Sequence, residues 1–271
     1  MRKLKNVLPA SSCCAFSILM CLPAAGQNAW SEADCVTLLD STSVTVQPNG
    51  SGSFAVYKSF KVQPPKGAVN NHVIKYDYDP LTAFARFKQV SVQRANGETM
   101  QVDVTKTCDY AAPARAIYWG ARQIMLELGR LEPGDVVSYE ISKKGFTYAL
   151  LAGAEDDDAR FIPPMRGQFY DIVPFWVNEP TRRKVYIVSM PMEKELQFQF
   201  YNGACTSSMR YEDGRKVYTF AVDEVLPFRK EPNMLDLFDE YQKLMMSSTP
   251  KWEDKSLWFH DLNEAYGSFA A

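Results

Sequence analysis

The side chains that could carry out covalent chemistry are few in this chain of 271 residues. The sequence holds two histidines, His72 and His260, and six cysteines. A cysteine hydrolase needs a thiolate paired with an imidazole and an orienting carboxylate. Cys108-Asp109 or Cys205 could form such a group only if the fold brought a histidine to it. Cys108 follows a predicted strand and does not open a helix, whose dipole would favour the thiolate. We therefore expect no catalytic residue.

The motifs of metal and phosphate chemistry are missing from the sequence. It contains no His-Glu-x-x-His, no Cys-x-x-Cys, no Gly-x-Ser-x-Gly and no Gly-Lys-Ser loop. The acids of 155–158 could bind calcium, but they lack the interleaved Asp-x-Asp-x-Gly spacing and are typical of a solvated loop. Glycoside hydrolysis uses a pair of carboxylates, but an acidic chain always contains such pairs, so their presence does not indicate a glycoside hydrolase. We expect no metal ligand and no cofactor.

The first 26 residues have the three-part pattern of a secretory signal. Three basic residues precede an apolar run that ends near Leu22, and Ala24-Ala25-Gly26 provides the small residues of a cleavage site. The apolar run is too short to cross about 30 Å of hydrocarbon. A membrane anchor and a lipid on Cys21 are the alternatives. We expect cleavage near Gly26-Gln27, export to the periplasm or cell surface of a Gram-negative bacterium, and no transmembrane segment in the mature chain.

Cleavage would also change the charge and the cysteine count. Loss of three basic residues lowers the formal net charge from −2 to −5. Because phosphate neutralisation needs a clustered excess of Lys and Arg, no nucleic-acid partner is expected. The remaining cysteines are Cys35, Cys108 and Cys205. Their odd number favours buried free thiols, and a Cys108–Cys205 disulfide stays open as the alternative.

Alternation of apolar and polar residues, typical of half-buried strands, runs through the body of the chain. It predicts strands at 43–46, 54–62, 72–78, 89–93, 100–104, 125–128, 135–142, 184–189, 196–201, 208–211 and 216–220. Asn96-Gly97 and Asp213-Gly214 tolerate the positive φ angles of tight primed turns and predict two hairpins. Asn49-Gly50-Ser51-Gly52 indicates a third.

The fold class that follows is mainly β: an extended antiparallel two-layer β-sandwich with a C-terminal amphipathic helix. About ten or eleven strands exceed an immunoglobulin domain. No internal repeat supports a duplication, so one extended sandwich is favoured over two tandem modules. The expected organisation is a signal peptide at 1–26, the sandwich at 27–247, and a helix or junction segment at 248–271.

The last segment predicts a helix from about 250 to 266. Ser248 or Thr249 suits the cap, Pro250 the first helical position and Gly267 the stop. Aromatic residues recur at close to helical spacing on one face. The candidate interface residues on this face are Trp252, Trp258, Phe259 and Tyr266. The face could pack against the sandwich, or it could contact a following domain or a separate partner.

Further aromatic residues are candidates for ligand binding. Tyr118, Trp119 and Trp176 could form a platform on which sugar rings stack. Large aromatic side chains are more often part of a core or an interface, because each buries about 150 Å² or more when packed inside. Both interpretations remain open for these three residues.

Five stretches of the sequence resemble the β-rich domain of unknown function that stands upstream of a transglutaminase-like core in secreted bacterial proteins. They are 90–98, 116–119, 131–140, 169–176 and 248–252. The resemblance covers most of residues 30 to 266. It implies an antiparallel sandwich, similar in shape to the N-terminal β domains of some zinc aminopeptidases, without a catalytic residue of its own. In fuller members a cysteine-histidine-aspartate core follows, and no mature cysteine here lies in such a motif.

These observations together indicate a non-enzymatic exported accessory or binding domain. Its expected partner is a downstream or separate transglutaminase-like domain, or a protein or glycan ligand. Two alternatives remain: an N-terminal fragment of a transglutaminase-like cysteine peptidase or amidase, and a carbohydrate-binding module.

Overall fold

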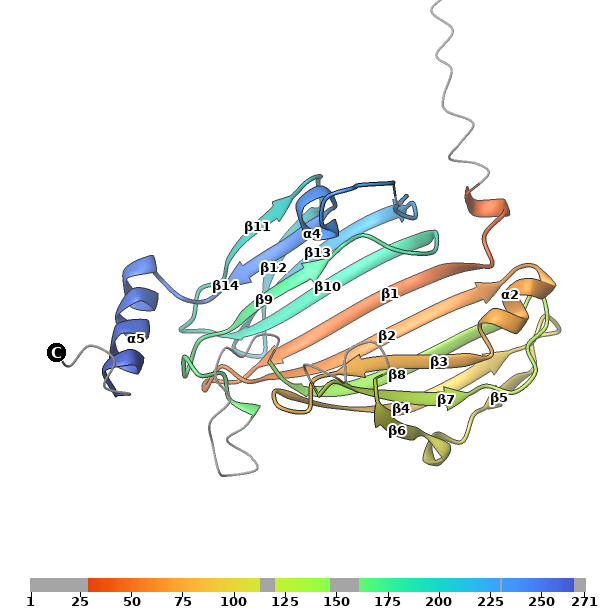
Figure 1. Cartoon of the computed structure of the whole chain (residues 1–271), viewed down its shortest axis with the longest axis horizontal. Helices are drawn as coiled ribbons and strands as arrows, with labels where there is room; N and C mark the ends of the chain where they lie inside the picture. Colours follow the sequence, from red (N-terminus) through yellow and green to blue (C-terminus); the bar gives the residue numbers. More distant parts are fainter. Residues whose placement is uncertain (1–28, 113–119, 147–160, 230, 266–271) are drawn as a thin grey trace, which may run out of the picture.

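The computed structural model describes residues 29–112, 120–146, 161–229 and 231–265, and the chain is mainly β (Figure 1). Its elements, in chain order, are β1 (Cys35–Val46), β2 (Gly52–Val62), α2 (Pro65–Asn70), β3 (Val73–Tyr78), β4 (Ala83–Gln93), β5 (Thr99–Gln101), η1 (Val104–Lys106), β6 (Cys108–Ala111), β7 (Arg122–Glu127), β8 (Val136–Gly145), β9 (Tyr170–Pro174), β10 (Thr181–Pro191), β11 (Gln197–Tyr201), β12 (Thr206–Glu212), β13 (Arg215–Val225), α4 (Leu237–Glu240), β14 (Lys243–Ser247) and α5 (Trp252–Ala265).

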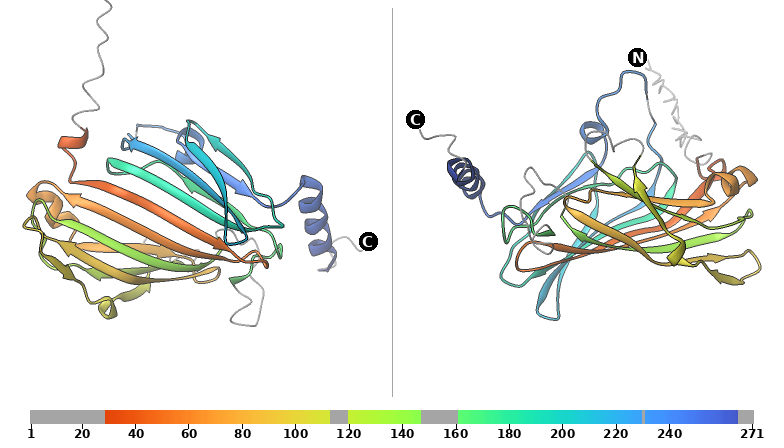
Figure 2. Two further views of the ribbon diagram at one scale, coloured as in Figure 1. Left: turned by 180° about the vertical axis from the view of Figure 1, so that it is seen from behind. Right: turned by 60° about the horizontal axis from the view of Figure 1, so that its bottom comes forward.

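The strands form two layers. Sheet A has eight strands in the order β12-β13-β10-β1-β2-β8-β4-β5, sheet B has the order β3-β7-β6, and sheet C has the order β11-β14-β9. Phe54 and Phe60 of β2 point to the same face of sheet A because their positions differ by an even number. Phe54 packs under sheet C and Phe60 under sheet B. The two small sheets therefore cover one face of sheet A, and the mainly β sandwich expected from the sequence is confirmed (Figure 2).

One strand pair joins the two halves of the large sheet. The strands β1 to β8 come from the first half of the chain and β9 to β14 from the second, and β1 pairs with β10 from Thr37↔Thr181 to Thr45↔Ser189. This pair is parallel, whereas the other pairs among the described strands are antiparallel. The antiparallel pattern of the sequence prediction thus holds on either side of a parallel junction.

Each half has its own hydrophobic core. One core lies between sheets A and B and includes Val92 and Leu126, and the other lies between sheets A and C and includes Val188 and Leu244. Val56 of β2 packs partly against both. The sandwich is continuous in its large sheet but divided in its apolar interior.

Polar side chains, here called the seam, connect the two cores. Tyr76 and Tyr139 pack against the first core and Tyr186 belongs to the second. The charged members of the seam are Asp40, Lys143, Asp171 and Lys184. The Tyr186 hydroxyl donates a hydrogen bond to the buried Asp171 carboxylate. Lys184 Nζ lies 3.3 Å from Asp40 Oδ2. Lys143 places its ammonium 4.6 Å from the centre of the Phe54 ring. Pairing of this kind compensates the cost of burying polar groups where the halves meet.

The predicted hairpins form, with different turns. Asp213 (φ 49°) and Gly214 (φ 69°) both have positive φ and join β12 to β13 in the expected primed turn. At Asn96-Gly97 only Gly97 has a positive φ angle, of 91°, and Arg94 N donates a hydrogen bond to Glu98 O across a longer loop. The prediction of a tight primed turn at Asn96-Gly97 was therefore wrong, although β4 and β5 pair as expected. β1 and β2 also form the third hairpin.

The predicted strand at 100–104 was wrong in its second half. Asp103 Oδ1 accepts a hydrogen bond from Thr105 N at 3.0 Å and begins the short η1 helix. This local side-chain bond competes with strand pairing. Three of the strands were not predicted from the sequence: β6, β9 and β14.

The C-terminal helix is confirmed as α5, with a later start than predicted. Lys251 N donates to Asp254 Oδ2 at 3.1 Å at the start of the helix. The Ser248 hydroxyl instead accepts a hydrogen bond from Phe169 N, so neither Ser248 nor Thr249 caps the helix. In Figure 1 α5 stands beyond one end of the sheets. Within the described residues, no helix is both long enough and apolar enough to span a membrane.

The seam predicts a loss of stability at alkaline pH. Burial, with the nearby charges of Asp171 and Asp40, raises the pKa of Tyr76 to about 12. A raised pKa means that the folded state favours the neutral phenol of Tyr76. The resulting contribution of Tyr76 to the free energy of unfolding is complete below the unfolded pKa of about 10 and is lost as pH rises towards 12. Tyr76→Phe should reduce the fall of the urea midpoint between pH 9 and 11. The exposed control Tyr211→Phe should leave that fall unchanged. Equal slopes in all three proteins would contradict the prediction.

Candidate functional site

The residues with the best catalytic chemistry are dispersed by the fold. His72 precedes β3 beside α2, and His260 lies on α5 at the opposite end of the molecule (Figure 1). Cys35 is buried, Cys108 is exposed and Cys205 is partly buried, and all three thiols are free. The expectation of free thiols is thus confirmed, but that of burial fails for Cys108. Among the described residues there is no group of three or more His, Cys, Asp or Glu side chains suited to a metal ion.

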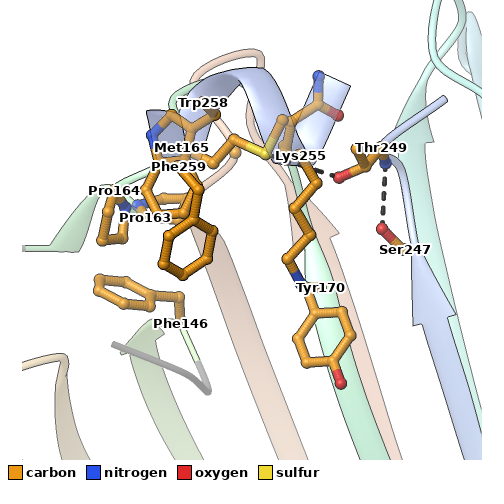
Figure 3. A pocket seen from close by; sticks show the side chains of 12 residues that line it. Phe146, Pro163, Pro164, Met165, Tyr170, Ser247, Thr249, Lys255, Trp258 and Phe259 are labelled. Atoms are coloured by element: carbon orange, nitrogen blue, oxygen red, sulfur yellow. Dashed lines mark hydrogen bonds between the residues drawn. The ribbon is translucent and has the colours of Figure 1, made fainter. Parts of the chain in front are cut away.

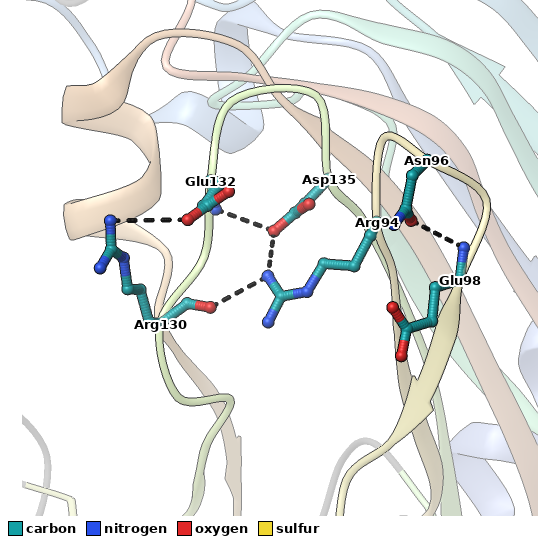
Figure 4. Close-up of polar contacts among 6 residues, drawn as sticks. All are labelled: Arg94, Asn96, Glu98, Arg130, Glu132 and Asp135. Atoms are coloured by element: carbon teal, nitrogen blue, oxygen red, sulfur yellow. Dashed lines mark hydrogen bonds and ion pairs between the residues drawn. The ribbon is translucent and has the colours of Figure 1, made fainter.

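Two of the stretches that carry the family resemblance meet in a buried ion pair (Figure 4). Arg94, in the β4–β5 turn, lies 2.5 Å from the Asp135 carboxylate and also donates to Arg130 O at 3.0 Å. The same carboxylate oxygen accepts from Glu132 N at 2.8 Å. The Asp135 side chain is only 2% exposed. This network ties the β4–β5 turn to the turn before β8, so Arg94 and Asp135 serve the fold.

Of the three aromatic residues suggested as a sugar platform, Trp176 is among the described residues. Tyr118 and Trp119 lie outside the described residues. Trp176 is half-buried and borders a hollow of about 410 Å³ with Val222 and Tyr241 on its walls. A stacking platform needs an aromatic ring open on one face, so binding of a sugar at Trp176 stays a prediction.

The candidate interface residues gather at the α5 end of the molecule. Trp252 is 80% exposed, Leu257 62% and Phe259 38%, whereas Trp258 is partly buried. The rings of Trp258 and Phe259 pack edge to face, with centroids 5.0 Å apart. Tyr266 lies outside the described residues. The helix therefore leaves a large part of its apolar surface in solvent.

A hollow of about 290 Å³ separates α5 from the end of the sandwich (Figure 3). Trp258 and Phe259 form its helix side, and Phe146 with the loop 163–165 forms the side that faces them. Most of these side chains are apolar, and Pro163-Pro164 restricts the backbone of the loop. The hollow has the apolar walls and modest size of a ligand pocket.

A second hollow, of about 350 Å³, lies on the outer face of sheet C. Gln197, Gln199 and Met245 belong to paired positions of β11 and β14, and Trp252 of α5 forms the opposite side. The amide of Gln197 donates to Pro250 O at 2.7 Å and so fixes the connection that leads into α5. The helix start is therefore held to the edge of sheet C.

The two hollows meet at four shared residues: Tyr170, Ser247, Thr249 and Lys255. We call the combined feature the α5 groove. Lys255 extends from the helix over the Tyr170 ring, with its ammonium 5.4 Å from that ring centre and 5.7 Å from the ring centre of Trp252 (Figure 3). Contacts with ring faces hold an ammonium in place without neutralising its charge. The groove thus has apolar walls and a cation near its middle.

The sequence marked only the helix side of this groove. Helical spacing identifies Trp252, Trp258 and Phe259. It does not identify Phe146, Met165 or the strand residues Gln197, Gln199 and Met245. A strand alternation cannot tell which outer-face residues will lie under a distant helix. Lys255 had one available signal, because it precedes Trp258 by three positions on the same side of a helix.

Comparison with known proteins places the fold. The family model DUF3857, described as a domain of unknown function with a solved structure, matches residues 48–229. No curated protein matches the chain. A crystal structure of a provisionally assigned protease from Parabacteroides distasonis has a TM-score of 0.63 and 13% identity, over 80% of this chain and 41% of that one.

An M1 zinc metallopeptidase from Deinococcus radiodurans is more distant. Its TM-score is 0.39 at 13% identity, over 79% of this chain and 42% of that one, and it carries no argument here. The chain spans about two fifths of the length of each of these two proteins. At this level of identity, the likeness to the Parabacteroides protein shows the fold alone.

Removing one side of the buried ion pair should destabilise the protein strongly. Arg94→Met leaves the Asp135 carboxylate buried beside a neutral side chain, and loss of one partner of a buried pair typically costs about 3 kcal/mol or more. The matched control is Arg122→Met, which removes the partly exposed pair with Asp109 (2.8 Å) and should cost less than about 1 kcal/mol. Urea denaturation at pH 7 measures both, and similar losses would contradict the assignment.

The thiols should differ in reactivity. Burial, with the nearby carboxylates of Glu179 and Asp34, raises the pKa of Cys35 to about 12. Because the thiolate is the reactive form, iodoacetamide at pH 8 should modify the exposed Cys108 and leave Cys35 intact until the protein unfolds. Peptide mapping by mass spectrometry, with and without urea, reads out each position. Modification of Cys35 as fast as Cys108 in the native protein would refute this ranking.

Proposed function

The chain belongs to the DUF3857 family, and we propose that it is an exported, non-enzymatic domain that binds a protein partner at the end of the sandwich where α5 lies. The partner that we propose is a transglutaminase-like catalytic domain, either in the same polypeptide or separate. In this role the sandwich is a rigid support, and α5 with its groove forms the contact surface.

The observation that carries the proposal is the exposed aromatic surface of α5. Trp252, at 80%, is the most exposed large apolar side chain among the described residues, and Leu257 lies on the same helix at 62%. Tryptophan is enriched where protein interfaces gain most of their binding energy. Large apolar side chains that are exposed to this degree are costly to leave in water and are typical of an interaction site.

The longer structural neighbour supports the choice of partner. The fold of this chain recurs within about two fifths of a protein provisionally assigned as a protease. The rest of that protein lies outside the likeness and has room for a catalytic domain. This supports a sandwich that accompanies catalysis and does not perform it.

The same neighbour favours a second candidate. The chain could form the N-terminal part of a transglutaminase-like cysteine peptidase or amidase, in which α5 would lead into the catalytic domain. The carbohydrate-binding alternative has less support, because its described aromatic candidate, Trp176, is half-buried.

The proposed interface can be tested with the purified chain and a transglutaminase-like catalytic domain from an exported protein of the same host. The double variant Trp252→Asp, Leu257→Asp should weaken the complex by about 100-fold in a titration by calorimetry, because charged residues replace two interface anchors. Val69→Asp is the matched control: Val69 is 69% exposed on α2 at the other end of the molecule, and its change should have no effect.

Two results would overturn the proposal. The first is binding of equal strength for the double variant and the parent. The second is turnover of a peptide, isopeptide or glycosidic substrate by the purified chain alone, with loss of that turnover when the thiols are alkylated.

A further inference from the structure

The α5 groove has a distinct charge pattern. The charged side chains among its described lining residues are Lys251 and Lys255, and no carboxylate is among them. The chain as a whole has a formal net charge of −2, so this is a local cationic site on an acidic protein. Complementarity therefore favours an occupant that carries a negative group near the centre of the groove.

The walls on both sides of Lys255 favour an apolar body for the same occupant. Phe146, Met165 and Phe259 border the first hollow, and Met245 and Trp252 border the second. An apolar ligand would remove these side chains from water on both sides of the lysine. A small inorganic anion would use the charge and leave the walls wet.

Polar groups along the floor distinguish a peptide from a fatty chain. The Thr249 hydroxyl has a weak contact with the Met165 sulfur at 3.8 Å, and the Ser247 hydroxyl accepts from Thr249 N at 3.1 Å. Gln199 adds an amide on the same face of sheet C. Covering hydroxyl and amide groups with methylene groups would leave hydrogen bonds unmade, whereas a peptide backbone can replace them.

We infer that the α5 groove binds an extended apolar peptide segment with a carboxylate placed at Lys255. The inference rests on the proposed binding role of this end of the molecule and specifies its ligand chemistry. Lys255 supplies the charge-assisted contact, and the two apolar hollows accept side chains on either side of it. Such a segment would be presented by the partner protein, as an acidic side chain or a free C-terminus within an apolar sequence.

The test uses the purified full-length chain and the peptide acetyl-Ala-Leu-Phe-Val-Leu, with a free carboxylate or a C-terminal amide. Tryptophan fluorescence follows binding, because Trp252 and Trp258 border the groove. The acid should bind about tenfold more tightly than the amide or better, as expected for a hydrogen bond to a charged group. Laurate serves as the fatty-chain probe and should bind more weakly than the peptide acid.

Variants at matched lysines assign the effect. Lys255→Gln should abolish the preference for the acid, and Lys255→Arg should retain it. Lys243→Gln is the control, because Lys243 lies on the same face of sheet C, with its ammonium 5.6 Å from the Tyr201 ring centre, but does not line the groove. Lys243→Gln should bind both peptides like the parent. Unchanged melting temperatures would show that each variant is folded.

Equal affinity for acid and amide, tighter binding of laurate than of the peptide acid, or no saturable binding of either peptide would each overturn the inference. The titration with the catalytic domain separates this failure from that of the proposed function. A complex that forms while the peptides fail leaves the proposed function standing. Peptide binding without a complex removes the proposed partner and keeps the groove.

Discussion

The parallel pairing of β1 with β10 is the constraint on which the rest of the molecule depends. It joins the first and last halves of the chain into one eight-stranded sheet, across seven paired positions. On either side, the antiparallel pairs build a half-sandwich with its own core. Val44, Val46 and Phe54 of the first half also pack in the second core, so apolar packing, the backbone hydrogen bonds of this pair and the polar seam together hold the halves in one orientation. That orientation in turn fixes where sheet C, and hence α5, can lie.

The seam shows how polar side chains buried near two apolar cores can be satisfied. Tyr186 and Asp171 satisfy each other, and Lys184 lies beside Asp40. Among the described residues, no buried side-chain nitrogen or oxygen lacks a hydrogen-bond partner. Burying a polar group costs desolvation free energy, and a hydrogen bond or an ion pair offsets that cost. The junction is therefore geometrically specific, since a shift of register between β1 and β10 would separate Lys184 from Asp40.

The stretches that resemble the family contribute both to the fold and to the groove, since Tyr170 and Trp252 lie in two of them and line the groove. Arg94 and Asp135 lie in stretches that resemble the family, and they make a buried ion pair between two turns. Lys255 and Phe259 lie on α5, beyond the part of the chain that matches the family model. Turns that fix the sandwich are tied to precise backbone geometry, whereas the groove depends on where a separate helix meets the end of the sheets. The family match thus covers the fold and only part of the groove.

The sequence by itself determined the local structure: the alternating strands, the Asp213-Gly214 turn with two positive φ angles, and a C-terminal helix with an aromatic face. These follow from period, turn chemistry and side-chain spacing, all of which act over a few residues. Short strands such as β9 and β14, the 3-10 turn at Asp103 and the parallel junction were not predictable, because they depend on partners far along the chain or on one local side-chain bond. The groove also belongs to the tertiary structure. It joins Phe146, Tyr170 and Lys255, which are distant in sequence, and only packing could place a lysine between two apolar hollows.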